Sequence, residues 1–241
     1  MSADRAEHDP DTVPLGGVLV SRLGLDDTIA LMGGWLDDPV GQRRVATANL
    51  DFLALDHDDE ALQHSLLLSD LVSADGAPLV WLSRLAGEPI AERVAGADFV
   101  VPLIGEAAQR GRSVYFLGGS DAAGQETIEI MRKRFPELIV AGQSAPMVNL
   151  KNEQACQSLA KEIATTGADL ALVGFGCPKQ DFFIDRYLAQ MNCRLAIGVG
   201  GTFNFITGRV RRAPPHVAEA RPGVALPLAH GATSAAAPLP Q

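Results

Sequence analysis

Asp75 is a carboxylate placed where an apolar segment ends. It stands in Ala74-Asp75-Gly76, directly after a predicted strand over residues 71–73. A carboxylate beside a flexible glycine can take a proton from a hydroxyl group that comes within hydrogen-bond reach. An aspartate before a glycine also commonly forms a turn or caps the next helix. The pattern therefore nominates Asp75 as a general base and leaves the turn or cap as the alternative.

The segment 174–181 has the strongest pattern for ligand binding. It reads Gly-Phe-Gly-Cys-Pro-Lys-Gln-Asp and follows the apolar run 170–173. Gly176 lets the backbone approach a ligand closely, while Lys179 and Gln180 offer a cation and an amide to a phosphate, a sugar or a base edge. The alternative is a strand–helix loop whose polar residues only face water.

Two other glycine-rich segments follow apolar runs. Gly118 and Gly119 precede a serine and could present backbone N–H groups to a phosphate at a helix N-terminus, or they could form a tight turn. The segment 200–204, Gly-Gly-Thr-Phe-Asn, repeats the arrangement, with Gly201 at the turn and Asn204 as a hydrogen-bonding group. Neither segment matches the dinucleotide or P-loop pattern.

A metal site is not expected from the residue pattern. The segment 56–58, Asp-His-Asp, has the Asp-x-Asp spacing that can hold a divalent cation on nucleotide-sugar phosphates. It precedes a predicted helix, where acidic residues are favourable in any case. The five histidines are scattered and show no metal-ligand spacing.

The composition fits one globular protein of the cytoplasm. The 241 residues are 47% apolar and 20% charged, and the net charge of −9 disfavours electrostatic binding to nucleic acid. Three cysteines without a Cys-x-x-Cys pair predict free thiols in a reducing compartment. The acidic, polar start is unlike a signal peptide, and no stretch approaches the about 20 apolar residues of a membrane span.

Predicted strands and helices alternate along the chain, which is typical of a mostly parallel sheet with helices on both faces. We therefore predict a Rossmann-like α/β fold in a single compact domain over residues 14–217, after a flexible leader at residues 1–13. The predicted strands are 18–20, 44–49, 71–73, 113–117, 138–142, 170–173 and 195–199. The predicted helices are 25–36, 60–69, 78–86, 99–110, 125–135 and 153–166, with a further helix between the last two strands.

Taken together, these motifs resemble the WecG/TagA/CpsF family of glycosyltransferases, also called glycosyltransferase family 26. The resemblance covers roughly residues 15–215. Each motif is weak alone, whereas the whole set in this order is specific. The matching pieces are Thr47-Ala48-Asn49, Ala74-Asp75-Gly76, Arg93-Val94-x-Gly96-x-Asp98, Gly118-Gly119, Gly176-x-Pro178-Lys179-Gln180, Gly198-Val199-Gly200-Gly201-x-Phe203 and Arg212-Ala213-Pro214.

The resemblance implies an inverting, metal-independent enzyme without a cofactor, which takes N-acetylmannosamine from a UDP-sugar. The acceptor would be a polyprenyl-diphosphate-linked sugar at the inner face of the cytoplasmic membrane, in cell-surface polysaccharide biosynthesis. By matching position, Asp75 is the expected catalytic base. Substrate binding is expected of Thr47, Asn49, Arg93 and Gln180, and nucleotide binding of Gly118, Gly119, Gly176, Lys179, Gly201 and Asn204.

The chain departs from the family pattern after Pro214. Members continue into a segment of the type Gly-Leu-Glu-Trp-Leu-Tyr-Arg and a basic helix, whereas residues 218–241 are rich in Ala, Pro, Gly and Leu and predict no regular structure. If the codons near Ala220 are read one base out of frame, a choice of synonymous codons exists that encodes the family segment. We therefore hypothesise a frameshift, which the nucleotide sequence would test, and expect weakened membrane association.

Two alternatives to an N-acetylmannosaminyltransferase stay open at this point. The family resemblance also fits a glucosyltransferase for exopolysaccharide. Loss of the basic appendage fits a non-catalytic remnant that binds a UDP-sugar. Association into a homo-oligomer is open as well.

Overall fold

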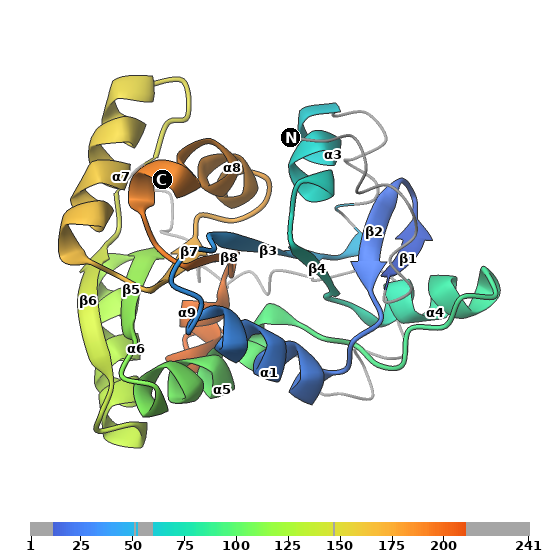
Figure 1. The fold of residues 1–241 in the computed structure, drawn as a ribbon, viewed down its shortest axis with the longest axis horizontal. Coiled ribbons are helices and arrows are strands. Elements are labelled where there is room, and N and C mark those ends of the chain that lie inside the picture. Colours follow the sequence, from blue (N-terminus) through green and yellow to red (C-terminus); the bar gives the residue numbers. More distant parts are fainter. Residues whose placement is uncertain (1–11, 51, 53–59, 147, 211–241) are drawn as a thin grey trace, which may run out of the picture.

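A six-stranded sheet, in which every strand pairs in parallel with its neighbours, forms the centre of the molecule (Figure 1). The computed structural model describes residues 12–50, 52, 60–146 and 148–210. The prediction of a mostly parallel sheet is confirmed. Across the sheet the order is β4 (Leu71–Ala74), β3 (Arg43–Ala48), β8 (Leu195–Gly198), β7 (Leu170–Gly174), β5 (Ser113–Gly118) and β6 (Ile139–Ser144).

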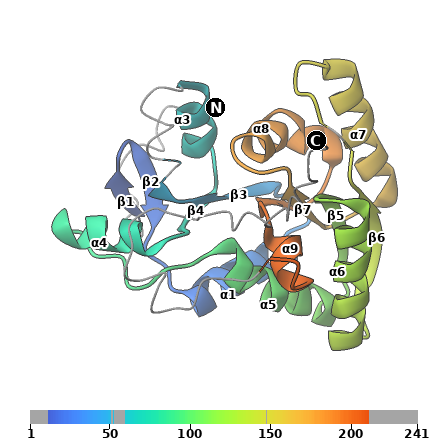
Figure 2. The same ribbon diagram turned by 180° about the vertical axis from the view of Figure 1, so that it is seen from behind.

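Helices cover both faces of this sheet, as predicted (Figures 1 and 2). One face carries α1 (Leu25–Trp35), α5 (Gly96–Gln109), α6 (Asp121–Arg134) and α9 (Thr202–Ile206). The other carries α3 (Glu60–Leu67), α7 (Glu153–Thr166) and α8 (Lys179–Met191). A further helix, α4 (Ala77–Leu85), lies beside β4 at one end of the sheet.

An antiparallel hairpin packs against the β4 end of the molecule. Its strands are β1 (Thr12–Leu15) and β2 (Val18–Ser21), and β2 lies against β4. The second strand was predicted, but the first was not. Thr12 and Val13, which we assigned to the leader, therefore belong to the folded domain. Residues 1–11 of that leader, residues 211–217 of the predicted domain and the tail 218–241 lie outside the described residues.

The central strands are apolar on both faces because helices cover both. Leu172 of β7 and Ile197 of β8 are fully buried against the helices of one face. Ala171 and Ala196 point the opposite way and pack with α7 and α8. Burying one Leu or Ile side chain stabilises the fold by about 1.5–3 kcal/mol, so these strands hold the sheet in place.

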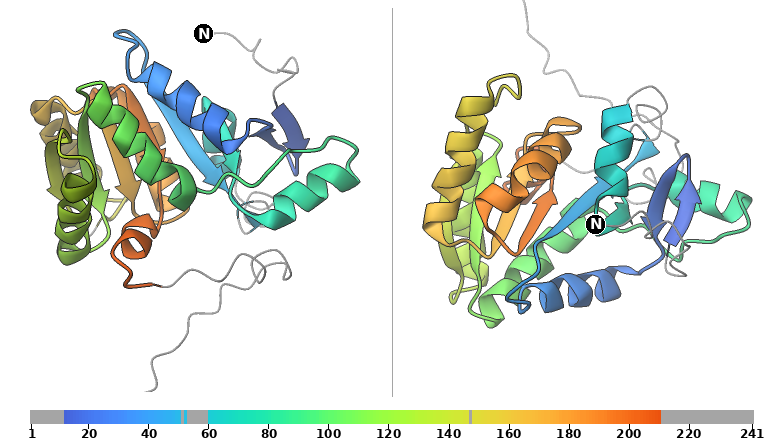
Figure 3. Two further views of the ribbon diagram at one scale, coloured as in Figure 1. Left: turned by 90° about the horizontal axis from the view of Figure 1, so that it is seen from below. Right: turned by 45° about the horizontal axis from the view of Figure 1, so that its top comes forward.

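Because all six strands run in the same direction, their carboxyl ends lie at one edge of the sheet, which we call the carboxyl edge. After β8 the chain enters α9 on one face, whereas after the neighbouring β7 it enters α8 on the other face. The two views of Figure 3 show α1 and α5 in front of the sheet in one and α3 and α8 in front in the other. Such a reversal is the place where ligands bind in open α/β sheets.

Candidate active site

Asp75 follows the last residue of β4 and lies at the carboxyl edge, half-buried. Its backbone N–H donates to Ala48 O at 2.7 Å, so the end of β3 holds it. The chain turns sharply at Gly76, whose φ of +154° is accessible to glycine, and α4 begins at the next residue. The N-cap of α4 is Gly76 rather than Asp75, so the alternative of Asp75 as that cap is not what the structure shows.

Arg93 lies beside Asp75 because its segment joins the end of β4. The N–H of the next residue, Val94, donates to Ala74 O at 2.9 Å. The Arg93 guanidinium forms an ion pair of 2.7 Å with Asp98 in the first turn of α5, and 39% of its side chain remains exposed. An anchored but accessible guanidinium can pair with a phosphate oxygen.

Thr47 and Asn49 stand at the end of β3, next to Asp75 along the carboxyl edge. Thr47 Oγ1 donates to Gly198 O of β8 at 3.3 Å and is almost fully buried. Asn49 is half-buried, and its Oδ1 accepts from Phe52 N at 3.0 Å. Both side chains thus shape the exit of β3, and their predicted contact with substrate stays a prediction.

Gln180 is buried, with 2% of its surface exposed. Its Oε1 accepts a hydrogen bond of 2.9 Å from Gly200 N, so it holds the loop that follows β8. A Cβ on Gly198 would lie 2.6 Å from Gln180 Nε2, and the glycine makes room for this amide. The predicted contact of Gln180 with substrate stays a prediction, and the structure adds a role in holding the β8 loop.

Gly118 and Gly119 have a packing reason to be glycine. Gly118 has a φ of +96°, and a Cβ on it would lie 2.6 Å from Gly174 O. Gly119 N donates to the same carbonyl at 3.0 Å. Four strand spacings separate β4 from β5, about 19 Å across the sheet, so this pair is remote from Asp75. Their predicted contact with the nucleotide stays a prediction.

The other residues predicted to bind nucleotide flank β7 and β8. Lys179 is exposed and is the first residue of α8, and Gly176 O accepts from Gln180 N in the same turn. Gly201 is the exposed N-cap of α9, and Asn204 within α9 is half-buried. Each lies at the carboxyl edge, which places them on the same edge as Asp75 but nearer the middle of the sheet.

The sequence analysis missed a buried polar pair behind Gln180. Arg44 of β3 is 7% exposed and Asp181 of α8 is 5% exposed. Burial raises the pKa of Asp181 to about 7, and the nearby Arg44 guanidinium opposes the rise. Arg44 stands in a segment predicted to be a buried strand, and a charged side chain there was the signal that could have found the pair.

The described residues contain no group of three or more His, Cys, Asp or Glu side chains placed to hold a metal ion. The Asp-x-Asp segment 56–58 lies outside them. The prediction of metal-independent chemistry therefore stays a prediction. Within the described ranges, no helix is long and apolar enough to cross a membrane.

The fold and its carboxyl edge define a class of protein: a doubly wound α/β protein with a carboxylate, a guanidinium and glycine-rich loops spread along the edge where ligands bind. The model of the glycosyl transferase WecG/TagA/CpsF family matches residues 13–222. The chain belongs to this family, and the resemblance found in the sequence is confirmed.

Two relatives carry the name N-acetylglucosaminyldiphosphoundecaprenol N-acetyl-beta-D-mannosaminyltransferase. The one from Bacillus spizizenii is 35% identical over 146 residues, which are 61% of this chain and 55% of the relative. The one from Bacillus subtilis is 27% identical over 180 residues, which are 75% of this chain and 68% of the relative. The matched part thus spans about half to two thirds of these relatives.

Proposed function

We propose that this protein transfers N-acetylmannosamine from a UDP-sugar to a lipid-linked acceptor, in the biosynthesis of a cell-surface polysaccharide. Membership of the family and the printed names of both relatives support this reading. Those names specify an N-acetylmannosaminyl transfer to a diphosphoundecaprenol-linked sugar. They favour this reading over a glucosyltransferase and over a non-catalytic remnant.

Asp75 is the proposed general base of a single displacement. The acceptor hydroxyl oxygen attacks the anomeric carbon of the donor, and its proton passes to the Asp75 carboxylate. As the new carbon–oxygen bond forms, the bond from the anomeric carbon to the diphosphate breaks, and UDP leaves with the electron pair. One displacement inverts the configuration at the anomeric carbon.

The leaving diphosphate needs positive charge or N–H donors that are already in place. Arg93 is a candidate because Asp98 anchors it while part of its side chain stays exposed. Lys179 is a second candidate at the first turn of α8. Asp98 orients the Arg93 charge before a donor arrives, whereas the Lys179 side chain is exposed and open to a diphosphate.

The position of Asp75 is the observation on which the proposal rests. It stands at the carboxyl edge, its backbone is fixed to Ala48 O at 2.7 Å, and the Arg93 segment is joined to the residue before it. The backbone segments that carry the Asp75 carboxylate and the Arg93 guanidinium are thus both joined to the end of β4. We propose that the lipid-linked acceptor reaches this corner from the inner face of the cytoplasmic membrane, with the protein bound peripherally.

A donor screen tests the proposed function. The purified chain is incubated with a synthetic N-acetylglucosamine-diphosphate-lipid as acceptor. Three parallel reactions each contain one donor: UDP-N-acetylmannosamine, UDP-N-acetylglucosamine or UDP-glucose. The proposal predicts a β-linked disaccharide-lipid with the N-acetylmannosamine donor. A product from UDP-glucose alone would support the glucosyltransferase instead, and binding of UDP without any product would support the remnant.

A further inference from the structure

Arg44, on β3, joins the two helices that lie over its end of the sheet. Its Nε donates to Leu68 O at 2.8 Å, just after α3, and its Nη2 donates to Ser65 O within α3 at 2.6 Å. Its Nη1 pairs with Asp185 of α8. Because the guanidinium is almost fully buried, these contacts fix α3 and α8 relative to β3.

Asp181 lies one turn before Asp185 on α8, and the contacts of Arg44 give its buried carboxylate oxygen no hydrogen-bond partner. Its backbone carbonyl accepts from Ser65 Oγ at 3.4 Å. Its carboxylate oxygen Oδ2 is buried and, among the residues that the structure describes, has no hydrogen-bond partner. Buried polar atoms are nearly always paired with protein or with an ordered water, so this atom needs an account.

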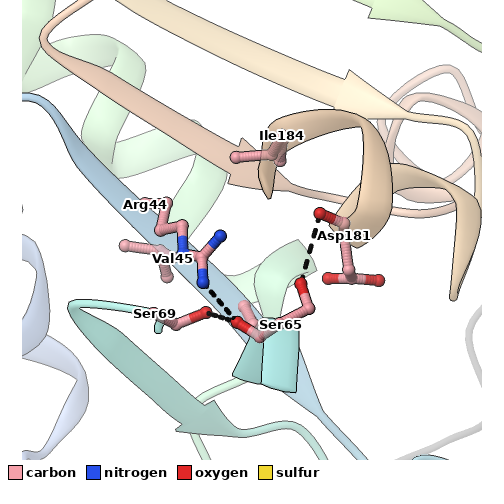
Figure 4. Close-up of a pocket in the computed structure, with 7 residues that line it drawn as sticks. Arg44, Val45, Ser65, Ser69, Asp181 and Ile184 are labelled. Carbon is pink, nitrogen blue, oxygen red and sulfur yellow. Dashed lines mark hydrogen bonds between the residues drawn. The ribbon is translucent and has the colours of Figure 1, made fainter. Parts of the chain in front are cut away.

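A small cavity lies between Arg44 and Asp181 (Figure 4). Its volume is about 10 Å³, and the rest of its wall is formed by Val45, Ala46, Ser65, Ser69 and Ile184. One water needs roughly 10–15 Å³ and two to four polar partners. A guanidinium has five N–H groups, and three of those of Arg44 are used by the contacts above, so further donors are present. The cavity therefore suits one water in size and chemistry.

The first turn of α8, which carries Asp181, also carries Gln180 of the candidate active site. Gln180 precedes Asp181 and accepts from Gly200 N at 2.9 Å, which fixes the loop between β8 and α9. The first turn of α8 thus lies between two sets of contacts. On one side is the loop between β8 and α9, and on the other are Arg44 and the residues that surround its guanidinium. A substitution of Asp181 would therefore shift Gln180 and weaken its hydrogen bond with Gly200 N.

We propose that Asp181 is a positioning residue for the candidate active site, joined to Arg44 through one water molecule in this cavity. It keeps the first turn of α8, and with it Gln180 and the Gly200 loop, in place. The effect on catalysis rests on the proposed function, whereas the effect on the Gly200 loop does not.

The charge around Asp181 agrees with this role. Arg44 from β3 and Asp185 from α8 are the charged groups at the cluster among the described residues, and α3 contributes the hydroxyls of Ser65 and Ser69. Because burial raises the pKa of Asp181, its carboxyl group is largely protonated in mildly acidic solution. In that form it donates to the water, and in the ionised form it accepts from it.

Amide hydrogen exchange at Gly200 tests the positioning role without any assay of transfer. Asp181→Leu keeps the side-chain size but cannot bind a water, whereas Asp181→Asn can. We expect exchange at Gly200 to be at least tenfold faster in Asp181→Leu than in the wild type and near wild type in Asp181→Asn. Exchange at Val199, which follows β8 and donates to Val173 O of β7, is the internal control and stays unchanged. Equal Gly200 exchange in all three proteins would overturn the proposal.

A crystal structure and a double-variant cycle complete the test. We expect one ordered water within hydrogen-bond distance of Asp181 Oδ2 and Arg44, and its absence from well-defined density would contradict the proposal.

If the chain is a transferase, Asp181→Leu should raise the KM for the UDP-sugar donor. The double variant Asp181→Leu/Gln180→Ala should have the same KM for the donor as Gln180→Ala alone. Additive effects would contradict the link through Gln180. A chain with no transferase activity would refute the proposed function, while the Gly200 exchange result would still decide the positioning role.

Discussion

Gln180 Oε1 accepts a 2.9 Å hydrogen bond from Gly200 N, and this contact joins the start of α8 to the loop that follows β8. The two residues belong to two glycine-rich segments that the sequence analysis selected separately. Their pairing makes these segments one structural unit at the carboxyl edge.

Gln180→Ala should weaken both the fold and the binding of donor. The change leaves the partly buried Gly200 N–H without its acceptor, and the loss of such a hydrogen bond costs about 0.5–1.5 kcal/mol. Urea unfolding measures this cost. Gln154→Ala, on the exposed side of α7, is the matched control and should change the free energy of unfolding by less than about 0.5 kcal/mol. A Gln180→Ala protein as stable as this control would contradict the structural role of the amide.

Gly118→Ala should destabilise the protein through a direct clash. A Cβ there would lie 2.6 Å from the backbone oxygen of Gly174, so the two strands must move apart. Gly111→Ala is the control, because Gly111 has a φ of +63° but a Cβ added to it would meet nothing within 4 Å. Both variants bear backbone strain of about 1–2 kcal/mol. Thermal unfolding should show a further loss of about 1–3 kcal/mol in Gly118→Ala alone, and equal losses would refute the clash.

Asp181 should make the fold less stable as the pH rises. Its pKa is raised from 3.8 to about 7 in the folded protein, so the unfolded chain loses this proton first. Relative to Asp181→Asn, the wild type should therefore lose stability between about pH 4 and pH 7, by up to about 4 kcal/mol. Urea unfolding of both proteins at pH 5 and pH 8 checks this. A constant difference between them would contradict a raised pKa.

Removal of divalent cations should leave transfer unchanged if the family resemblance holds for the chemistry. The proposed mechanism assigns the leaving diphosphate to Arg93 and Lys179. Assays with and without EDTA, followed by addition of Mg²⁺ or Mn²⁺, measure the dependence. Loss of activity with EDTA and its recovery with either cation would show that the Asp-x-Asp segment 56–58 or another group binds a metal.

Much of the sheet could be predicted because its strands are apolar runs that end in glycine or polar residues. The position of Asp75 followed from the same logic, since the ends of parallel strands meet at one edge. The strand at Thr12 was missed because it is short, contains Pro14 and is defined by its partner across the hairpin. The charge of Arg44 in a predicted strand was a signal that this position is unusual. Its proximity to Asp181 was missed because the two residues are far apart in the chain, and no local pattern encodes which residues lie beside Arg44.

The assay of Asp75→Asn tests the central claim most directly. The variant keeps the size and shape of the side chain but cannot take the proton of the acceptor hydroxyl. Turnover of UDP-N-acetylmannosamine with the lipid-linked acceptor should fall by about 100-fold to 10,000-fold, while UDP binding stays near that of the wild type. Glu137→Gln, an exposed carboxylate just before β6 at the opposite edge of the sheet, should retain full turnover. An Asp75→Asn protein with the turnover of the wild type would contradict the assignment of Asp75 as the catalytic base.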